Sequence, residues 1–386
     1  MQKNLELYVH IPFCMKKCSY CDFLSFPASE ELQADYVKAL VQEINAYGKK
    51  MTDYEVSTIY IGGGTPSWLD EHQLCYILEN IYQSFSIQKE AEISMECNPG
   101  TITKKKMQKY RNAGINRLSI GLQSANNEEL KLLGRVHTFE QFLKTYELAR
   151  EADFSNINVD LMSGIPYQTT EKFLETLEKI TNLEPEHISA YSLIIEQGTL
   201  FYEKYQCDIE KREKGHTPNA LPTEEEEYRI YKATQDFLKM AGYEQYEISN
   251  YAKKGFACKH NIGYWTRENY LGLGLGSASL IENVRYTNRS DLSAYLKNPT
   301  CGTATVLSRK EQMEEFMFLG LRMNCGVSRA DFKAQFGISI DAIYKKVLEE
   351  LHQEGLLERS AGRIYLTEKG QDIANYVMAK FLIDKS

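Results

Sequence analysis

The chain has 386 residues, a net charge of −8, 43% hydrophobic residues and 25% charged residues. These are ordinary values for a globular protein with a sizeable core, and they exclude wholesale disorder. The negative charge argues against a general nucleic-acid binder, because phosphate contacts need a surplus of lysine and arginine.

The sequence also bears on where the protein works. No run approaches about 18 apolar residues, so we predict no membrane span, and the first residues lack the basic-then-apolar pattern of a signal peptide. The chain has nine cysteines, an odd number. In a reduced compartment, clustered cysteines bind metals or iron–sulfur clusters more often than they form disulfides. We therefore expect a cytoplasmic protein.

Short apolar strands alternate with amphipathic helices through the first half of the chain. The predicted strands are Leu5–Ile11, Thr58–Ile61, Glu92–Glu96, Arg117–Gly121, Asn156–Leu161 and His187–Tyr191. The predicted helices are Glu30–Tyr47, Asp70–Tyr82, Thr103–Ala113, Glu128–Leu133, Phe139–Ala152 and Thr170–Thr181. Strand–helix units in succession predict an α/β fold with a parallel sheet and right-handed crossovers. The motif positions described below favour a partial barrel over an open sheet.

The regular alternation ends after the sixth strand. Residues 203–226 are polar and contain glycine and proline, so we predict a long surface excursion there. A helix is predicted at Glu224–Ala241, and residues 243–290 have no clean period. We divide the chain into 1–200, a barrel; 201–306, an excursion, a helix and a segment closing the barrel; and 307–386, a separate unit.

The last unit, 307–386, has the element order of a winged helix. A long helix is predicted at Ile340–Glu354, followed by a hairpin that turns near Ala361 and Gly362. Its basic and acidic residues are equal in number, whereas a DNA-reading wing should be basic. We therefore interpret it as a lid or docking domain for the barrel.

Three cysteines, Cys14, Cys18 and Cys21, follow the first strand with the spacing C-x3-C-x2-C. Thiolates suit iron–sulfur clusters, and three of them leave one iron of a [4Fe–4S] cubane without a protein ligand. That open iron can chelate S-adenosylmethionine (SAM), whose reductive cleavage is then chemistry of the cofactor. The alternative is a structural zinc site, with His10 as the fourth ligand. The spacing favours the cluster, and the loop lies at the strand end where barrel enzymes place their chemistry.

Further polar and glycine residues follow later strands on the same predicted face. A glycine-rich loop, 62–66, follows the second strand and would let the backbone approach a ligand closely. Polar side chains occur at or near the later strand ends, namely Glu96, Gln123, Arg135 and Asp160. Each alone could be structural, but their recurrence on one face predicts a binding site.

Five stretches together resemble the oxygen-independent coproporphyrinogen III oxidase family over nearly the whole chain. They are Tyr8–Cys14, Gly63–Pro66, Glu96–Thr101, Leu133–Thr138 and Asp160–Pro166. Within that family the chain is most similar to the HemW-like branch, whose members are heme chaperones. Two features carry this: Phe23 stands where the oxidase has a further cysteine, and His260–Trp265 matches the branch motif His-Asn-x-x-Tyr-Trp.

The resemblance implies a partial (β/α)6 radical SAM barrel with a smaller helical domain at the carboxyl terminus. It implies a SAM site made by Tyr8, Gly64, Thr65, Glu96, Gln123, Arg135 and Asp160. It also implies heme as a ligand and a heme-acceptor protein as a partner, for which a membrane-associated respiratory enzyme is one candidate.

The heme ligand stays open at this point. His260 is a candidate axial ligand, and Tyr264 and Trp265 could pack on the macrocycle. Cys258 and His10 are alternatives. His260 could equally be a hydrogen-bonded structural residue in an aromatic segment.

Two functions remain in competition. The first is a heme chaperone carrying a cluster and SAM, which Phe23 and the His260 motif favour. The second is a radical SAM oxidoreductase that decarboxylates coproporphyrinogen III or a related tetrapyrrole, which the full set of SAM-site residues keeps in play. We predict the chaperone and regard true coproporphyrinogen oxidase activity as the weaker alternative.

Overall fold

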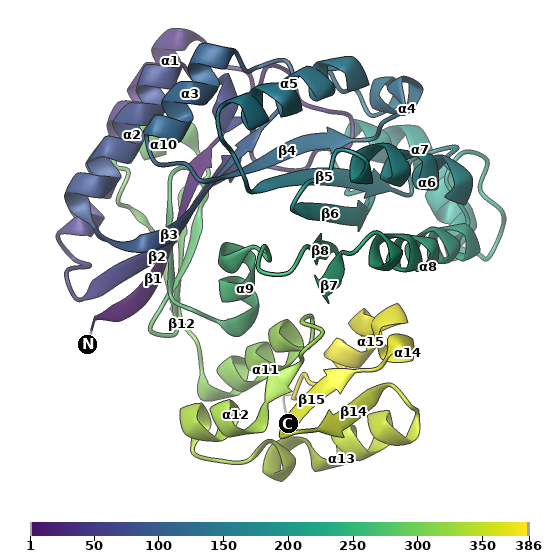
Figure 1. Cartoon of the computed structure of the whole chain (residues 1–386). Helices are drawn as coiled ribbons and strands as arrows, with labels where there is room; N and C mark the ends of the chain where they lie inside the picture. The colour runs from purple at the N-terminus through teal and green to yellow at the C-terminus, as the bar shows by residue number, and fades with distance from the viewer. Residues whose placement is uncertain (1, 384–386) are drawn as a thin grey trace.

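The computed structural model describes residues 2–383, which form one large sheet flanked by helices and a smaller unit below it (Figure 1). Along the large sheet the strands are ordered β12-β11-β10-β9-β1-β2-β3-β4-β5-β6-β8-β7. The smaller sheet has the order β13-β15-β14. Strands β1 to β6 pair in parallel with one another, as the sequence predicts.

The strands of the large sheet are β1 (Lys3–Ile11), β2 (Tyr54–Gly63), β3 (Ser86–Cys97), β4 (Arg117–Gln123), β5 (Ile157–Ser163), β6 (His187–Ser192), β7 (Glu244–Glu247), β8 (Asn250–Ala252), β9 (Tyr270–Leu273), β10 (Ala278–Ile281), β11 (Val284–Asn288) and β12 (Gly302–Val306). Those of the smaller sheet are β13 (Val327–Ser328), β14 (Leu357–Ser360) and β15 (Arg363–Leu366). Each of the first six overlaps its predicted range, and β2 and β3 are longer because their amino-terminal halves also pair.

The helices up to residue 297 are α1 (Glu30–Gly48), η1 (Pro66–Trp68, a 3₁₀ turn), α2 (Glu71–Ser84), α3 (Lys104–Asn112), α4 (Asn127–Leu132), α5 (Phe139–Glu151), α6 (Thr170–Thr181), α7 (Leu200–Glu213), α8 (Glu224–Met240), α9 (Lys259–Thr266) and α10 (Leu292–Lys297). The remaining helices are α11 (Arg309–Gly320), α12 (Arg329–Phe336), α13 (Ile340–Gln353), α14 (Glu368–Asp372) and α15 (Ala374–Ala379). Most of them begin after a Ser, Thr, Asp or Asn whose side chain accepts a hydrogen bond from the first turn.

The alternation along the parallel strands separates an apolar layer from a polar interior. On β1 the side chains of Leu5, Leu7 and Val9 are fully buried in one core with Tyr36 and Leu40 of α1. Because successive side chains of a strand point to opposite faces, the residues between these apolar ones line the inside of the barrel. The apolar outer layer holds the barrel together and leaves its interior free for polar groups.

The middle of the chain extends the sheet at both edges. Strand β9 pairs in parallel with β1, and β10, β11 and β12 follow it in antiparallel order. At the other edge β8 and β7 add antiparallel strands to β6. Part of the predicted excursion is helical, because α7 spans Leu200–Glu213 and buries Phe201 and Tyr205 in a small apolar cluster.

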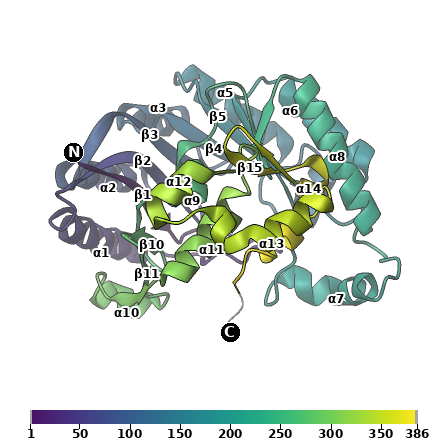
Figure 2. The same ribbon diagram turned by 90° about the horizontal axis from the view of Figure 1, so that it is seen from below.

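The last unit has a core of its own and the order predicted for a winged helix. Its hairpin turns at Ala361 and Gly362, with φ of 49° and 76°, and Ser360 pairs with Arg363. The unit contacts α9 and α8 and lies below α9, β7 and β8 in Figure 1; Figure 2 shows it from beneath, in front of the large sheet. The predicted fold class, an α/β barrel with a helical winged-helix-like unit, is therefore confirmed.

Candidate functional site

The loop that carries the three cysteines is tied to the ends of several elements. It leaves β1 and returns beside it, where the Cys14 amide donates to Phe26 O at 3.2 Å. Its middle is held from two sides, because the Ser19 amide donates to Leu133 O at 3.1 Å and the Phe201 amide donates to Ser19 O at 2.9 Å. The backbone of the loop is thus fixed by α4 and α7, both far from it in sequence.

The cysteines share one cavity with most of the predicted SAM residues. The cavity has a volume of about 270 Å³ and lies at the carboxyl ends of β1 to β6. Its lining includes Cys14, Cys18, Cys21, Gly64, Thr65, Glu96, Gln123, Arg135 and Asp160. Strand ends that are far apart in sequence therefore meet at one place, as the parallel-sheet argument predicts.

The donor set fits a cluster better than a closed zinc site. His10 cannot serve as the fourth zinc ligand without losing contacts, because its Nδ1 is 3.0 Å from Tyr8 Oη and its Nε2 is 3.0 Å from Leu24 O. Within residues 2–383 no three His, Cys, Asp or Glu side chains are arranged to hold a single ion. A four-iron cubane is wider than one ion and needs thiolates around a larger space, and the three cysteines line one cavity.

The glycine loop packs against the end of β1 so closely that a side chain cannot fit. A Cβ on Gly64 would lie 2.6 Å from Phe13 O. The loop is further fixed because the Thr65 amide donates to Phe13 O at 2.7 Å and Asn98 Nδ2 donates to Thr65 Oγ1 at 2.8 Å. Glycine here lets the backbone form part of the cavity wall.

Glu96 is held at the cavity by the same loop. Its Oε2 accepts from the Gly63 amide at 3.1 Å and its Oε1 accepts from Tyr60 Oη at 3.2 Å. Burial and the nearby Asp160 carboxylate raise the pKa of Glu96 to about 7, against the effect of these hydrogen bonds. A carboxylate of this kind can accept hydrogen bonds from hydroxyl or ammonium groups of a ligand.

Gln123 adopts a conformation that non-glycine residues rarely take. Its φ is 75°, and the pairing of β4 with β5 shifts register between Gly121 and Gln123. The strained backbone is stabilised because Tyr191 Oη donates to Gln123 Oε1 at 2.7 Å. Such strain and such bulges concentrate at functional sites, since they redirect a side chain toward a ligand.

Arg135 connects the cysteine loop to the strand ends. Its Nη2 donates to Asn98 Oδ1 at 2.8 Å and to Gly121 O at 2.6 Å, and its Nη1 lies 3.7 Å from Cys18 Sγ. Its Nε is buried without a partner. The guanidinium therefore places positive charge beside a cysteine thiolate, where a negatively charged cluster would be stabilised.

Tyr8 lies outside the lining of this cavity. Its hydroxyl is hydrogen-bonded to the His10 ring and its own ring is stacked 6.4 Å from Tyr60. The structure therefore brings together six of the seven predicted SAM residues, and it places Tyr8 next to them through Tyr60, which does line the cavity.

The His260 motif lies elsewhere. It forms helix α9, and the His260 side chain is only 1% exposed. Its Nδ1 is 2.7 Å from Thr58 Oγ1, and its Nε2 is 3.0 Å from the Tyr264 hydroxyl. Burial and the nearby Arg117 lower the pKa of His260 to about 3, so the ring is neutral. In this arrangement both ring nitrogens already have partners.

The two other candidates around α9 are engaged as well. Cys258 is fully buried, and its Sγ lies 3.5 Å from Glu92 Oε1. Trp265 faces the carboxyl-terminal unit, where the Arg322 guanidinium lies 4.3 Å from its ring centroid. The residues predicted to bind heme therefore form a packed region between the barrel and that unit rather than the wall of the cysteine cavity.

Several cavity residues were not singled out from the sequence, namely Lys16, Lys17, Tyr60, Asn98, Ser119 and Tyr191. The strand residues among them had a detectable signal. Tyr60, Ser119 and Tyr191 lie an even number of positions from residues that line the barrel on the same strand, so they point to the same side. Asn98 had no such signal, since its role depends on where Thr65 and Arg135 come to lie.

Comparison with known families agrees with this architecture. Residues 8–180 match the radical SAM superfamily, and residues 307–373 match the HemN C-terminal domain. The chain is similar to the solved structure of coproporphyrinogen III oxidase (HemN) from Escherichia coli, a radical SAM enzyme, with a TM-score of 0.85 and 25% identity, over 99% of this chain and 90% of that one.

Curated relatives match along the whole length. The heme chaperone HemW of Lactococcus lactis is 36% identical, over 100% of this chain and 99% of the relative. HemW of Bacillus subtilis is 36% identical over 97% of this chain and 98% of its own, and HemW of Escherichia coli is 33% identical over 98% of each. The chain therefore belongs to the HemW-like branch of the radical SAM superfamily.

Proposed function

We propose that this protein binds heme and transfers it to an acceptor protein, and that it carries a [4Fe–4S] cluster with exchangeable SAM. The cluster would be held by Cys14, Cys18 and Cys21. SAM would be bound by Tyr8, Gly64, Thr65, Glu96, Gln123, Arg135 and Asp160. The cluster supplies an iron site for SAM and an electron, while the protein residues orient SAM and exclude water from it.

The observation that carries the proposal is the full-length similarity to heme chaperones. A second observation supports it. Phe23 lines the mouth of the cysteine cavity, and its side chain is 67% exposed, although most large apolar residues of the chain are buried. An exposed aromatic ring at this place can pack on a flat apolar ligand such as a porphyrin.

The heme ligand is proposed from the motif around His260. His260, with Tyr264 and Trp265, remains our first candidate from the motif. For His260 to coordinate iron, it must lose its hydrogen bond to Thr58 or to Tyr264, so α9 would have to move. Cys258 and His10 would have to lose partners in the same way.

An anaerobic heme titration followed by absorbance tests the proposal. The cluster-reconstituted wild type should give a saturable Soret change. His260→Ala should weaken it, whereas His352→Ala, a histidine on the exposed side of α13, should leave it unchanged. Saturable binding that His260→Ala does not affect would move the ligand to Cys258 or His10. The absence of saturable binding in the wild type would contradict the proposal.

A second candidate function is oxidation of a tetrapyrrole by radical SAM chemistry. The likeness in fold to coproporphyrinogen III oxidase and the assembled SAM-site residues favour it. One electron from a reductant would cleave SAM to methionine and a 5′-deoxyadenosyl radical, which would take a hydrogen atom from a propionate side chain of coproporphyrinogen III to give 5′-deoxyadenosine. The substrate radical would then lose carbon dioxide and pass one electron to an acceptor, leaving a vinyl group. We expect no decarboxylated product from this chain.

We also propose that the protein works in the cytoplasm and delivers heme to an acceptor such as a membrane-associated respiratory enzyme. Every cysteine of the described residues is a free thiol. Within residues 2–383, none of the helices has the length and apolar character needed to cross a bilayer.

A further inference from the structure

A buried arginine that the SAM site does not use stands out among the charged groups of the barrel. Arg117 is the first residue of β4 and is 1% exposed. Among the described residues, the guanidinium of Arg117 makes one long hydrogen bond, of 3.5 Å from Nη1 to Ser94 Oγ. Its Nε is buried and has no partner among these residues. A guanidinium has five N–H donors and stays charged, so an almost unpaired one in a barrel interior is costly.

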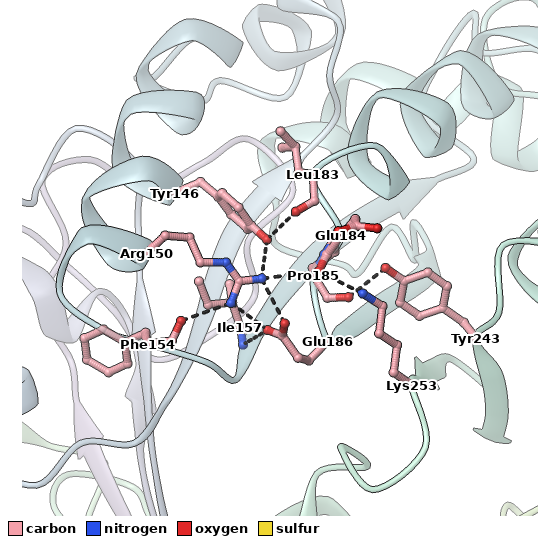
Figure 3. Close-up of polar contacts among 10 residues, drawn as sticks. All are labelled: Tyr146, Arg150, Phe154, Ile157, Leu183, Glu184, Pro185, Glu186, Tyr243 and Lys253. Atoms are coloured by element: carbon pink, nitrogen blue, oxygen red, sulfur yellow. Dashed lines mark hydrogen bonds and ion pairs between the residues drawn. The ribbon is translucent and has the colours of Figure 1, made fainter.

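The half-buried Arg150 shows how this chain satisfies an arginine elsewhere (Figure 3). Its two terminal nitrogens donate to both carboxylate oxygens of Glu186 at 2.9 and 3.0 Å. They also donate to Phe154 O at 3.0 Å and to the Tyr146 hydroxyl at 2.6 Å. Arg150 is less buried than Arg117 and yet has far more partners. The lack of hydrogen-bond partners is therefore a feature of Arg117 and its surroundings, which Arg150 does not share.

Arg117 borders a second cavity of about 170 Å³ inside the barrel. This second cavity adjoins the cysteine cavity, since both are lined by Tyr60, Ser119, Asp160 and Tyr191. Its remaining lining residues are polar, namely Asn158, Ser189, Ser249, Asn250 and Asn261. A mostly polar space beside a cation whose Nε lacks a partner has the composition of an anion site, and its one acidic lining residue, Asp160, is held by hydrogen bonds from Ser119 and Asn158.

The two carboxylates that interact electrostatically with Arg117, Glu92 and Asp160, already accept hydrogen bonds from other groups. Glu92 accepts from the Lys259 amide at 3.1 Å and the His260 amide at 3.3 Å, at the start of α9, and contacts the Cys258 thiol. Asp160 accepts from Ser119 Oγ at 3.0 Å and from Asn158 Nδ2 at 2.7 Å. Both interact electrostatically with Arg117, but in the described part of the chain neither forms an ion pair with it.

Asn261 connects this cavity to the His260 motif. It follows His260 on α9 and is one of the residues that line the cavity. Helix α9 is fixed at two places: the His260 ring is hydrogen-bonded to Thr58 and Tyr264, and the Glu92 carboxylate accepts from the first amides of the helix. In the motif, therefore, the histidine holds the helix in place and the asparagine borders the cavity.

We propose that the second cavity binds a carboxylate group, which Arg117 holds through charge-assisted hydrogen bonds and Asn261 contacts with its side-chain amide. The planar, forked geometry of a guanidinium matches a carboxylate. This inference rests on the proposed function: if the protein binds heme, the carboxylate is a propionate side chain of the tetrapyrrole. A small free carboxylate is the other source of the same chemistry.

The first experiment tests the cavity without heme. Thermal unfolding of the cluster-reconstituted chain is followed in sodium propionate and in sodium chloride of equal concentration. Propionate should raise the melting temperature of the wild type and of Arg150→Gln, the control, but not that of Arg117→Gln. Asn261→Ala, which removes no buried charge, should reduce the shift even if Arg117→Gln folds poorly. Equal shifts in wild type, Arg117→Gln and Asn261→Ala would overturn the inference.

The second experiment identifies the source of the carboxylate by comparing heme with its dimethyl ester. If a propionate side chain occupies the cavity, the wild type binds the free acid about tenfold or more tightly than the ester, and Asn261→Ala and Arg117→Gln reduce this preference. Stabilisation by propionate without this preference assigns the site to a small free carboxylate. Heme binding with neither effect overturns the inference and leaves the proposed function intact. If no heme binds at all, the proposed function fails, and the propionate-induced shift in melting temperature alone then tests whether the second cavity binds a carboxylate.

Discussion

At the scale of single residues, the site depends on side chains that the barrel brings together at its carboxyl-terminal end. Cys18 and Arg135 are far apart in sequence and lie 3.7 Å apart between Sγ and Nη1. The cysteines, Glu96 and Asp160 could be predicted from spacing and from their places at strand ends. Asn98 and Arg117 could not, because their importance comes from partners that only the folded chain supplies or withholds.

The cysteine assignment predicts a clear loss on substitution. Cys18→Ser should lower iron and sulfide content after reconstitution and abolish the broad visible absorbance of the cluster, because a cubane with two protein thiolates is poorly held. Cys207→Ser, at an exposed position outside the cavity, should keep both. Full iron content in Cys18→Ser would exclude this cysteine as a ligand.

A buried acid beneath the site predicts how stability depends on pH. Burial, with help from Glu268 and Glu92, raises the pKa of Glu6 to about 9. Folding therefore favours the protonated form. This contribution is complete below the ordinary carboxyl pKa of 4.5 and is lost as the pH rises toward 9.

Glu6→Gln should accordingly stabilise the protein at pH 8.5, on the order of a few kcal/mol, and change little at pH 5. Urea unfolding at the two pH values measures this. The neighbouring Glu268→Gln serves as a comparison, since it removes only one of the charges that act on Glu6. An equal effect of Glu6→Gln at both pH values would contradict the assignment.

At the scale of elements, periodicity and capping residues located the repeated strand–helix units well. The predictions failed where pattern is weak. The polar stretch after residue 200 contains α7, which is helical because Phe201 and Tyr205 pack into a local apolar cluster. Likewise, α9 is short, and the buried Glu92 carboxylate stabilises its start by accepting from the first amides. Glu92 is far from α9 in sequence, so no local pattern predicts this contact.

The hairpin of the carboxyl-terminal unit offers a test at this scale. Two-residue turns with positive φ at both positions favour Asn followed by Gly. Ala361, with a φ of 49°, is sterically strained in this conformation. Ala361→Asn should therefore raise the free energy of unfolding by roughly 0.5–1 kcal/mol. Ala361→Val should lower it, because a β-branched residue fits this conformation poorly. Chemical denaturation of the three chains measures both changes, and destabilisation by Ala361→Asn would refute the turn.

At the scale of the whole molecule, the carboxyl-terminal unit lies against α9 and α8 and apart from the cysteine cavity. None of the described residues after 306 lines the cavity. The unit instead meets the barrel through Arg267, which donates to Glu315 at 3.1 Å, and through Arg322, which lies over Trp265. It is therefore positioned to control α9, and with it the His260 motif, rather than to cover the cluster.

This docking contact can be tested through Arg322. Its guanidinium lies over Trp265 and donates to the buried Glu247 carboxylate at 3.4 Å. Arg322→Ala should destabilise the protein by about 1–3 kcal/mol and change the emission of Trp265, since both groups lose a partner. Cluster content should not change. Arg359→Ala, an arginine in the hairpin away from this contact, should leave the emission unaltered, and an unaltered emission in Arg322→Ala would refute the docking.

The central claim, that the protein binds heme, is tested most directly by co-elution. The cluster-reconstituted chain is mixed with excess heme under anaerobic conditions and separated by size exclusion, and heme, iron and protein are quantified in the same peak. We predict one heme per chain in the protein peak, retained on a second passage. Heme that elutes only with the small molecules, from a chain that has kept its cluster, would contradict the account.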